Sequence, residues 1–284
     1  MEKELNPTHS TTVLNERQKE NFTIKYTNSA ENDEYIAIYF SSNGIYFPNT
    51  LETFEHTIIN RNRYEWTSNL IQKAHKHIFV RDLFKQWYLE GISSELNTIE
   101  TVLSLLRRET AGKKIITVGS SAGGYASILF GTMLNAEIIF SFAPQLSLRV
   151  WAQESQAERD PLLFKHFHNK AVNQYYDLKD YIERSRSYVF YFAPANSTLD
   201  IPQVEVAQSI SNIKMFKFTS SKHGVPFTLP ALTSIMNRDT SELIDLYNKY
   251  KGKEINPLLF SVKIAGLYPN IRMAIKKIQK KLKR

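Results

Sequence analysis

The stretch TVGSSAGGYAS, residues 117–127, constrains the fold of this chain more than any other segment. It follows a strand-like run, KKIITV, and it opens a run of helical composition, AGGYASILFGTML. The chain has only 10 glycines in 284 residues, and Gly119, Gly123 and Gly124 all fall here. Glycine lets a backbone turn sharply and approach its neighbours closely. The stretch therefore predicts a tight turn between a strand and a helix.

Ser121 lies at the centre of this turn, with glycine at the second position on either side. G-x-S-x-G between a strand and a helix is typical of a serine nucleophile held on a strained turn, where larger flanking side chains would collide with it. The N-terminus of the following helix favours developing negative charge. A glycine-rich turn capped by serine is the alternative. The phosphate-binding patterns G-x-x-x-x-G-K-[ST] and G-x-G-x-x-G do not fit.

Strand-like runs alternate with helical segments along the rest of the chain. The run YIAIYF is apolar throughout, as in strands that are buried on both faces of a sheet. The alternation predicts an α/β fold with a mostly parallel central sheet and helices on both faces. We expect a flexible N-terminal arm at residues 1–21, a main domain at 22–260 with a helical insertion at about 145–185, and a tail at 261–284.

Composition excludes several classes of site. The chain has no cysteine, which rules out disulfides, a cysteine nucleophile and thiolate metal sites, and we expect no metal. The first twenty residues lack the apolar core of a signal peptide, and no run approaches the length of a membrane span. The expectation is a soluble protein of the cytoplasm.

The net charge of +8 is concentrated in the last fourteen residues, IRMAIKKIQKKLKR. This segment has no acidic residue and seven basic ones, namely Arg272, Lys276, Lys277, Lys280, Lys281, Lys283 and Arg284. Subtracting these seven charges from +8 leaves +1 for residues 1–270. A nucleic-acid-binding domain more often carries basic residues across a folded face, so we expect no nucleic-acid partner.

The same tail has an apolar stripe, because Ile271, Ile275, Ile278 and Leu282 recur at helical spacing. A basic amphipathic helix is typical of a segment that lies on an anionic membrane surface. This predicts a protein associated peripherally with the inner face of the membrane, or with a partner protein there. The alternative is a terminal helix that packs its stripe on the domain.

A serine nucleophile requires a base and an acid that orients the base. His223 lies in SSKHGVPF, directly after the strand-like run KMFKF, where such a base is expected. His166 and His168 fall in the insertion, where surface or substrate-facing roles are expected. Asp200 is the acidic residue in the loop after SYVFYFAP, although it could instead cap the following helix. The predicted triad is Ser121, Asp200 and His223.

An acyl-transfer site also needs two N–H donors for the oxyanion. The residue after the nucleophile, Ala122, is expected to supply one of them. The second is expected from the loop FSSNGIYF, with Ser42 and Asn43 as candidates and Gly44 permitting close approach. The Asn-Gly pair is also a turn signal by itself.

The order of serine, aspartate and histidine on this strand pattern resembles the α/β-hydrolase fold over residues 35–250. The HGGG oxyanion motif of many lipases and esterases is absent. The segments YFSSNG, NRYEW, IFVRDLFKQWYLEG and VGSSAGGYASILFG resemble bacterial capsular polysaccharide O-acetyltransferases of this fold. The resemblance implies a Ser-Asp-His triad, acetyl-CoA as acyl donor, and a capsular or surface polysaccharide as acceptor. Capsule-synthesis proteins are the partners expected at the C-terminal tail, as the alternative to an anionic membrane surface.

Aromatic and arginine side chains in these segments are candidates for substrate binding. Aromatic faces stack on sugars, and arginine pairs with phosphates of CoA or of a polymer. The candidates are Gly44, Tyr46, Arg63, Trp66, Arg81 and Trp87. The alternatives are core packing for the aromatic residues and a structural ion pair between Arg81 and Asp82.

Three functions fit these residues. The leading hypothesis is an O-acetyltransferase that acts through an acyl-Ser121 intermediate. A serine esterase or thioesterase has the same triad and differs only in using water to resolve the acyl-enzyme. A non-catalytic scaffold of polysaccharide synthesis is the third, and a complete triad argues against it.

Overall fold

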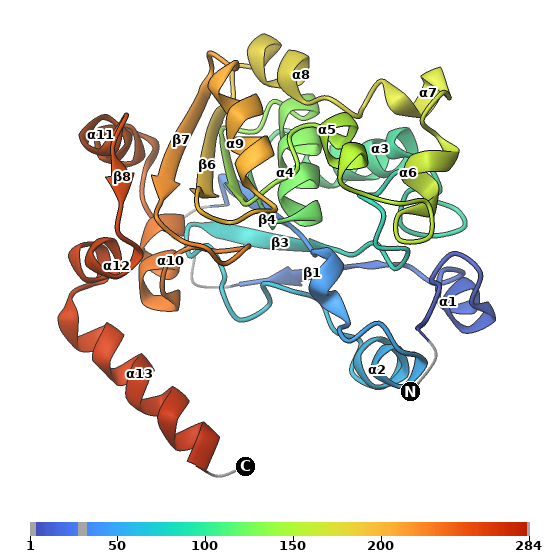
Figure 1. Ribbon diagram of the computed structural model, residues 1–284, viewed down its shortest axis with the longest axis horizontal. Helices are drawn as coiled ribbons and strands as arrows, with labels where there is room; N and C mark the ends of the chain where they lie inside the picture. Colours follow the sequence, from blue (N-terminus) through green and yellow to red (C-terminus); the bar gives the residue numbers. More distant parts are fainter. Residues whose placement is uncertain (1–3, 28–32, 283–284) are drawn as a thin grey trace.

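The computed structural model describes residues 4–27 and 33–282. Its centre is an eight-stranded sheet in the order β1-β3-β2-β4-β5-β6-β7-β8 (Figure 1). β1 runs antiparallel to β3, and the other neighbouring pairs are parallel. The strands are β1 Phe22–Tyr26, β2 Tyr35–Phe40, β3 Ala74–Val80, β4 Lys114–Ser120, β5 Ile138–Phe142, β6 Tyr188–Pro194, β7 Ile213–Phe218 and β8 Glu254–Ile255. The predicted fold class is confirmed.

Helices cover the sheet and extend the chain at both ends. They are α1 Thr11–Glu16, α2 Leu51–Phe54, α3 Ile99–Thr110, α4 Ala122–Met133, α5 Leu148–Gln153, α6 Pro161–Lys165, α7 Lys170–Asn173, α8 Lys179–Arg184, α9 Ile201–Gln208, α10 Leu229–Met236, α11 Thr240–Tyr250, α12 Pro257–Ala265 and α13 Leu267–Leu282. Two irregular turns, the 3₁₀ turn η1 Asn43–Ile45 and the π turn η2 Glu55–Ile59, follow β2. The segment of the expected insertion, between β5 and β6, contains α5 to α8. In the described ranges, we find no helix with the length and apolar character needed to cross a membrane.

Alternation along the strands builds one core on each face of the sheet. In β2, Ile38 and Phe40 join the core formed with α3, α4, α8 and α9. Ala37 and Tyr39 join the opposite core, with α10, α11 and α12. All four side chains are fully buried. Burying a large apolar side chain stabilises the folded state by roughly 1.5–3 kcal/mol. Because β2 is buried on both faces, apolar residues are favoured at every position of this strand.

The N-terminal segment differs from the flexible arm predicted for residues 1–21. Residues 4–21 contain α1, which packs through the fully buried Val13. Asn21 is also fully buried, and its Oδ1 accepts a hydrogen bond from Arg81 Nε at 2.9 Å. The polar composition of this segment does not predict the packing. The buried side chains of Asn21 and Arg81 form a hydrogen bond with each other that only the folded chain brings together. Residues 1–3 lie outside the described residues.

The sheet reverses its direction of growth at β2. β3 pairs with one edge of β2 and β4 with the other, so consecutive strands lie on opposite sides of it. In α/β sheets, loops at the carboxyl ends of strands around such a point form the ligand-binding crevice. The residues after β2, beginning with Ser41, and the residue after β4, Ser121, lie at this point.

Candidate active site

Ser121 occupies a strained turn between β4 and α4. Its φ of 56° and ψ of −125° lie in a region that residues with a β carbon rarely adopt. Its N–H donates to Phe142 O at 2.8 Å, and its carbonyl accepts the Tyr125 N–H at 2.9 Å. The Ser121 side chain makes no capping hydrogen bond with α4. The backbone is therefore held on both sides, while the hydroxyl is not used to cap the helix.

The flanking glycines are required by sterics. A β carbon at Gly119 would lie 1.9 Å from Gly123 O, and one at Gly123 would lie 2.3 Å from Phe40 O. Such separations are far below van der Waals contact. The G-x-S-x-G pattern thus reflects a turn that folds back on itself and packs against the end of β2.

Asp200 and His223 meet at the neighbouring strand ends. Asp200 follows β6, and His223 follows β7. His223 Nδ1 lies 3.0 Å and 2.9 Å from the two carboxylate oxygens of Asp200. The Asp200 side chain is 0% exposed and that of His223 is 27% exposed. A buried carboxylate on Nδ1 keeps the proton there and leaves the Nε2 lone pair for a reacting group.

Asp200 also occupies the position that precedes α9, where a capping role was the alternative. It makes no side-chain hydrogen bond to that helix. Its carboxylate is directed to His223 instead.

The histidine loop lies beside the nucleophile turn. Gly224 has a φ of +103°, which side chains with a β carbon rarely allow. A β carbon at this position would lie 3.9 Å from Ser120 Oγ. The loop that holds His223 therefore passes close to the residue directly before Ser121. The structure brings the three predicted triad residues to one edge of the sheet, and their catalytic roles stay a prediction.

Two predicted oxyanion donors remain available. Ala122 is the first residue of α4, and N–H groups in the first turn of a helix have no acceptor within it. Ser42 requires a correction, because its N–H donates to Glu65 Oε2 at 2.7 Å. The next N–H, that of Asn43, opens η1 and has no acceptor among the described residues. Asn43 is therefore the better candidate in this loop.

Glu65 and Tyr88 hold the loop after β2. Sequence reasoning assigned no role to Glu65, and it left Tyr88 open between sugar stacking and core packing. Glu65 Oε1 accepts the Ser42 hydroxyl at 3.1 Å, and the Glu65 N–H donates to Ser41 Oγ at 3.3 Å. The Tyr88 hydroxyl donates to Ser41 O at 2.8 Å. Burial raises the pKa of Glu65, and the hydrogen bonds from Ser42 oppose this rise. The one available signal was an acidic residue inside the aromatic segment NRYEW.

Tyr46 and Arg81 are corrections to the predicted substrate residues. Tyr46 is fully buried, and its hydroxyl donates to Leu83 O at 2.7 Å. Arg81 is also buried, and besides Asn21 it donates to Arg63 O at 2.9 Å. Both polar groups are used inside the protein, so neither faces a ligand.

The remaining candidates support the site in different ways. Trp66 donates from Nε1 to Phe40 O at 3.2 Å and stacks on Phe142. Arg63 donates to Ile45 O at 3.2 Å, and the Gly44 N–H donates to Ser42 Oγ at 3.0 Å. These contacts stabilise the end of β2 and the η1 turn.

A cavity of about 610 Å³ joins the oxyanion loop to the loop of the acid. Asn43 lines it from η1, and Leu199, which precedes Asp200, lines it from the other side. Trp151 lines it and packs edge-on against Trp87, with ring centroids 5.8 Å apart. Trp87 is only 1% exposed, so the alternative of core packing describes this residue. The Nε1 groups of Trp87 and Trp151 donate to Gln145 Oε1 and Asp160 Oδ2, each at 3.0 Å. Hydrogen bonds thus fix the orientation of both rings before any ligand binds.

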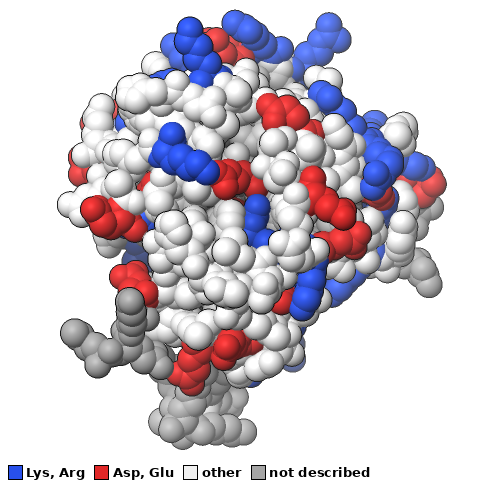
Figure 2. Space-filling view, turned by 90° about the vertical axis from the view of Figure 1, so that its right-hand side faces the viewer, with Lys and Arg blue, Asp and Glu red and all other residues white. Residues whose placement is uncertain are grey.

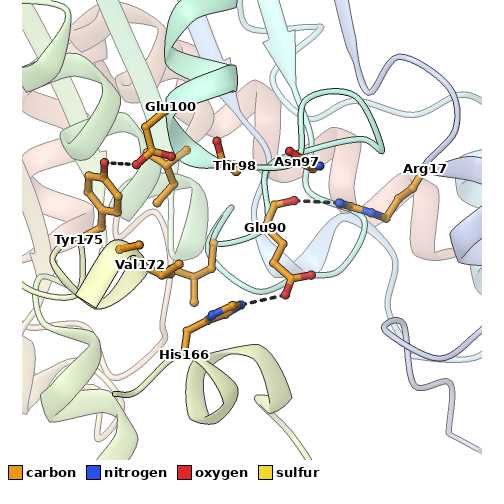
Figure 3. A pocket seen from close by; sticks show the side chains of 11 residues that line it. Arg17, Glu90, Asn97, Thr98, Glu100, His166, Val172 and Tyr175 are labelled. Atoms are coloured by element: carbon orange, nitrogen blue, oxygen red, sulfur yellow. Dashed lines mark hydrogen bonds and ion pairs between the residues drawn. The ribbon is translucent and has the colours of Figure 1, made fainter. Parts of the chain in front are cut away.

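His166 lines a second cavity, of about 360 Å³. Figure 3 shows His166 and Glu90 pointing toward one another, with Nε2 2.8 Å from Oε1. On the opposite side of Glu90, Arg17 donates to its carbonyl at 2.8 Å. His166 is therefore paired with Glu90 and not with Asp200, the acid that contacts His223. Within the described ranges, no group of three His, Cys, Asp or Glu side chains could hold a metal ion.

Comparisons with known proteins agree with this geometry at the level of the fold. No protein-family model matches the chain, and no curated protein sequence matches it. A solved structure of a protein with unknown function from Staphylococcus aureus subsp. aureus Mu50 is similar, with a TM-score of 0.51 at 11% identity, over 81% of this chain and 94% of that one.

Two further solved structures are similar at lower scores. A capsule O-acetyltransferase of Neisseria meningitidis serogroup A has a TM-score of 0.49 at 15% identity, over 81% of this chain and 89% of that one. Acetyl xylan esterase 1 from Thermoanaerobacterium sp. JW/SL YS485 has a TM-score of 0.44 at 13% identity, over 81% of this chain and 78% of that one. The strand order and the nucleophile turn are those of the α/β-hydrolase fold, which this chain has.

Proposed function

We propose that this chain is a serine O-acetyltransferase that moves an acetyl group from acetyl-CoA to a hydroxyl of a bacterial capsular or surface polysaccharide. The observation that carries the proposal is Ser121 on its strained turn at the same edge of the sheet as the Asp200–His223 pair, with a cavity reaching the loops of Asn43 and Leu199. Acyl transfer is the chemistry for which this combination is suited. The choice of donor and acceptor rests on the sequence resemblance to capsular O-acetyltransferases.

The first half-reaction acetylates Ser121. Its Oγ attacks the thioester carbonyl while His223 Nε2 takes the hydroxyl proton. The oxyanion accepts hydrogen bonds from the N–H groups of Ala122 and Asn43. The carbon–sulfur bond then breaks, and the CoA sulfur leaves with the proton from His223. The products are acetyl-Ser121 and free CoA.

The second half-reaction transfers the acetyl group to the sugar. His223 removes the proton of an acceptor hydroxyl as its oxygen attacks the acetyl carbon. The bond from carbon to Ser121 Oγ breaks, and Oγ takes back the proton from His223. Asp200 stabilises the imidazolium in both halves without becoming protonated.

The aromatic-walled cavity favours a sugar acceptor. Its volume of about 610 Å³ lies within the range of small-molecule sites, which combine aromatic walls with a few polar groups. A sugar bound against Trp151 would lie beside the loops of Asn43 and Leu199, next to the catalytic edge, and would help to exclude water there. Partial exposure of His223 is the observation that favours the second candidate, an esterase or thioesterase, since water can reach the base.

Intact-protein mass after brief incubation with acetyl-CoA tests the proposal, with wild type compared with Ser121→Ala. We expect one acetyl adduct on wild type and none on the variant. Capsular oligosaccharide should discharge the adduct faster than water does. Free acetate and CoA are assayed in the same tubes, so that fast turnover is not mistaken for inactivity.

The other outcomes of this experiment separate the alternatives. If acetate is released rapidly and added oligosaccharide does not change the rate of release, the protein is a hydrolase and not a transferase. If wild type shows no adduct and releases no acetate, acetyl-CoA is not the donor.

Glu65→Gln is expected to lower kcat by roughly 10-fold to 100-fold with little change in KM. A carboxamide has one acceptor oxygen for the two donors of Ser42, so the loop that presents the Asn43 N–H loses one restraint. The loss should be at most that for removal of an oxyanion donor, about 10²–10³ in kcat. Steady-state kinetics check this, with the exposed Glu55→Gln as the control. A rise in KM at constant kcat would argue for a role in binding instead.

A further inference from the structure

The last helix exposes the apolar stripe that an amphipathic helix ordinarily buries. In Figure 1, α13 extends away from the sheet toward the C-terminus. Ile271, Ile275 and Ile278 are 46%, 49% and 58% exposed. A surface helix of a globular domain normally packs its apolar stripe on the core. The alternative of a terminal helix packed along the domain therefore does not describe α13.

Charge indicates what covers the stripe. From Ile271 onward the sequence has seven basic residues and no acidic residue, with Lys283 and Arg284 outside the described residues. By contrast, Figure 2 shows acidic and basic side chains interspersed over the face that carries α1, α6 and α7. A second copy of α13 on the stripe would bring two sets of like charges together. An anionic surface complements both the apolar stripe and the basic residues.

A groove at the base of α13 extends the same surface. It has a volume of about 410 Å³ and lies between α10 and α13. Leu229 and Tyr268 line it and are 50% and 74% exposed, and Arg272 and Lys276 line it as well. Apolar and aromatic side chains next to cationic groups match the boundary between lipid headgroups and acyl chains.

The base of α13 is tied to the connection that holds the catalytic histidine. Asn270 Oδ1 accepts a hydrogen bond from Thr228 Oγ1 at 2.5 Å, and Asn270 Nδ2 donates to Ser261 O at 3.1 Å. The Thr228 N–H donates to Ser261 Oγ at 3.1 Å. Thr228 and His223 belong to the same segment between β7 and α10. The helix is therefore anchored at its base, in a defined orientation to the catalytic edge.

We propose that α13 docks on an anionic lipid surface, with Ile271, Ile275 and Ile278 at the headgroup boundary and the basic residues among the headgroups. Docking of this kind does not depend on the reaction that the active site performs. It would hold the catalytic edge at a fixed orientation to the membrane.

Vesicle flotation tests the proposal, with no acyl donor present. The full chain is mixed with vesicles of phosphatidylcholine alone, or of phosphatidylcholine with phosphatidylglycerol. We expect flotation with the phosphatidylglycerol vesicles, and apparent affinity at least roughly tenfold weaker without phosphatidylglycerol or at high salt. Absence of binding to the anionic vesicles would overturn the proposal.

Two variants separate the stripe from the charge. The triple change Ile271→Ser, Ile275→Ser and Ile278→Ser keeps the charges and should weaken binding at least roughly tenfold. The triple change Lys276→Gln, Lys277→Gln and Lys280→Gln keeps the stripe and should remove most of the salt dependence. The matched control, Leu14→Ser with Ile59→Ser, changes exposed apolar residues elsewhere and should bind as wild type does.

Binding that is insensitive to the isoleucine changes would contradict the proposed orientation. Sedimentation of the free protein provides the remaining test. A self-associating wild type that the same changes convert to a monomer, without vesicle binding, would assign the stripe to a second copy of this chain. Thermal unfolding monitors the fold of each variant.

Discussion

Ser121→Ala is expected to lower the rate of acetyl transfer by at least about 10⁴-fold, because it removes the atom that carries the acetyl group. The fold should persist. Alanine, like serine, has a β carbon, and the backbone hydrogen bonds of residue 121 to Phe142 and Tyr125 do not involve the side chain. Rates of oligosaccharide acetylation give kcat/KM, and circular dichroism gives the melting temperature.

The matched control for this variant is Ser104→Ala, on the exposed side of α3. Its hydroxyl donates only to Glu100 O within its own helix, so the rate should equal that of wild type. Full activity in Ser121→Ala would remove the covalent mechanism altogether. A small residual rate is consistent with it, since the oxyanion donors and bound substrates still act without the nucleophile.

Asp200→Asn is expected to reduce kcat by about 10⁴-fold while the melting temperature changes far less than activity does. The carboxamide can present N–H groups to His223 Nδ1. This favours the tautomer with its proton on Nε2, which cannot accept the proton of Ser121. Because the Asp200 side chain is 0% exposed, water does not restore the lost acceptor. Pre-steady-state release of CoA should show that acetylation of Ser121 itself is slowed.

Asp180→Asn provides the comparison for a charge change alone. Asp180 lies in α8 and forms an exposed ion pair with Arg184 at 3.2 Å, and exposed pairs contribute little to stability. Its rate and melting temperature should stay near those of wild type. A wild-type rate in Asp200→Asn would assign the orienting role to another residue.

The parts of the site that follow from local rules could be predicted from the sequence. Strands buried on both faces select continuous apolar runs, which is why β2 and β4 were recognisable. The turn at Ser121 requires glycine at fixed positions for steric reasons, so its signature is short and local. Asp200 and His223 were found because each follows a strand that could itself be recognised.

The parts that depend on contacts between distant segments could not be predicted. Arg81 bonds to Asn21 across 60 positions of the sequence, and Glu65 bonds to Ser42 across 23. A buried polar pair satisfies itself only once both members are brought together. From the sequence alone, each residue of such a pair is predicted to lie on the surface or to bind a ligand. This explains why Arg81 was assigned to a substrate and why Glu65 was assigned no role.

Part of the wall of the aromatic cavity comes from segments outside the catalytic edge, although Asn43 and Leu199 belong to the loops of that edge. Residues 4–8 and residues 156 and 158–161 line the cavity without belonging to the central sheet. Changes there can reshape the space for an acceptor while the strand ends and their reactive groups stay in register. Selectivity in such a protein can therefore drift under mutation while its chemistry stays the same. A chimera can be made by exchanging only these two segments between related chains. Its preference among acceptors should be that of the chain from which the two segments were taken.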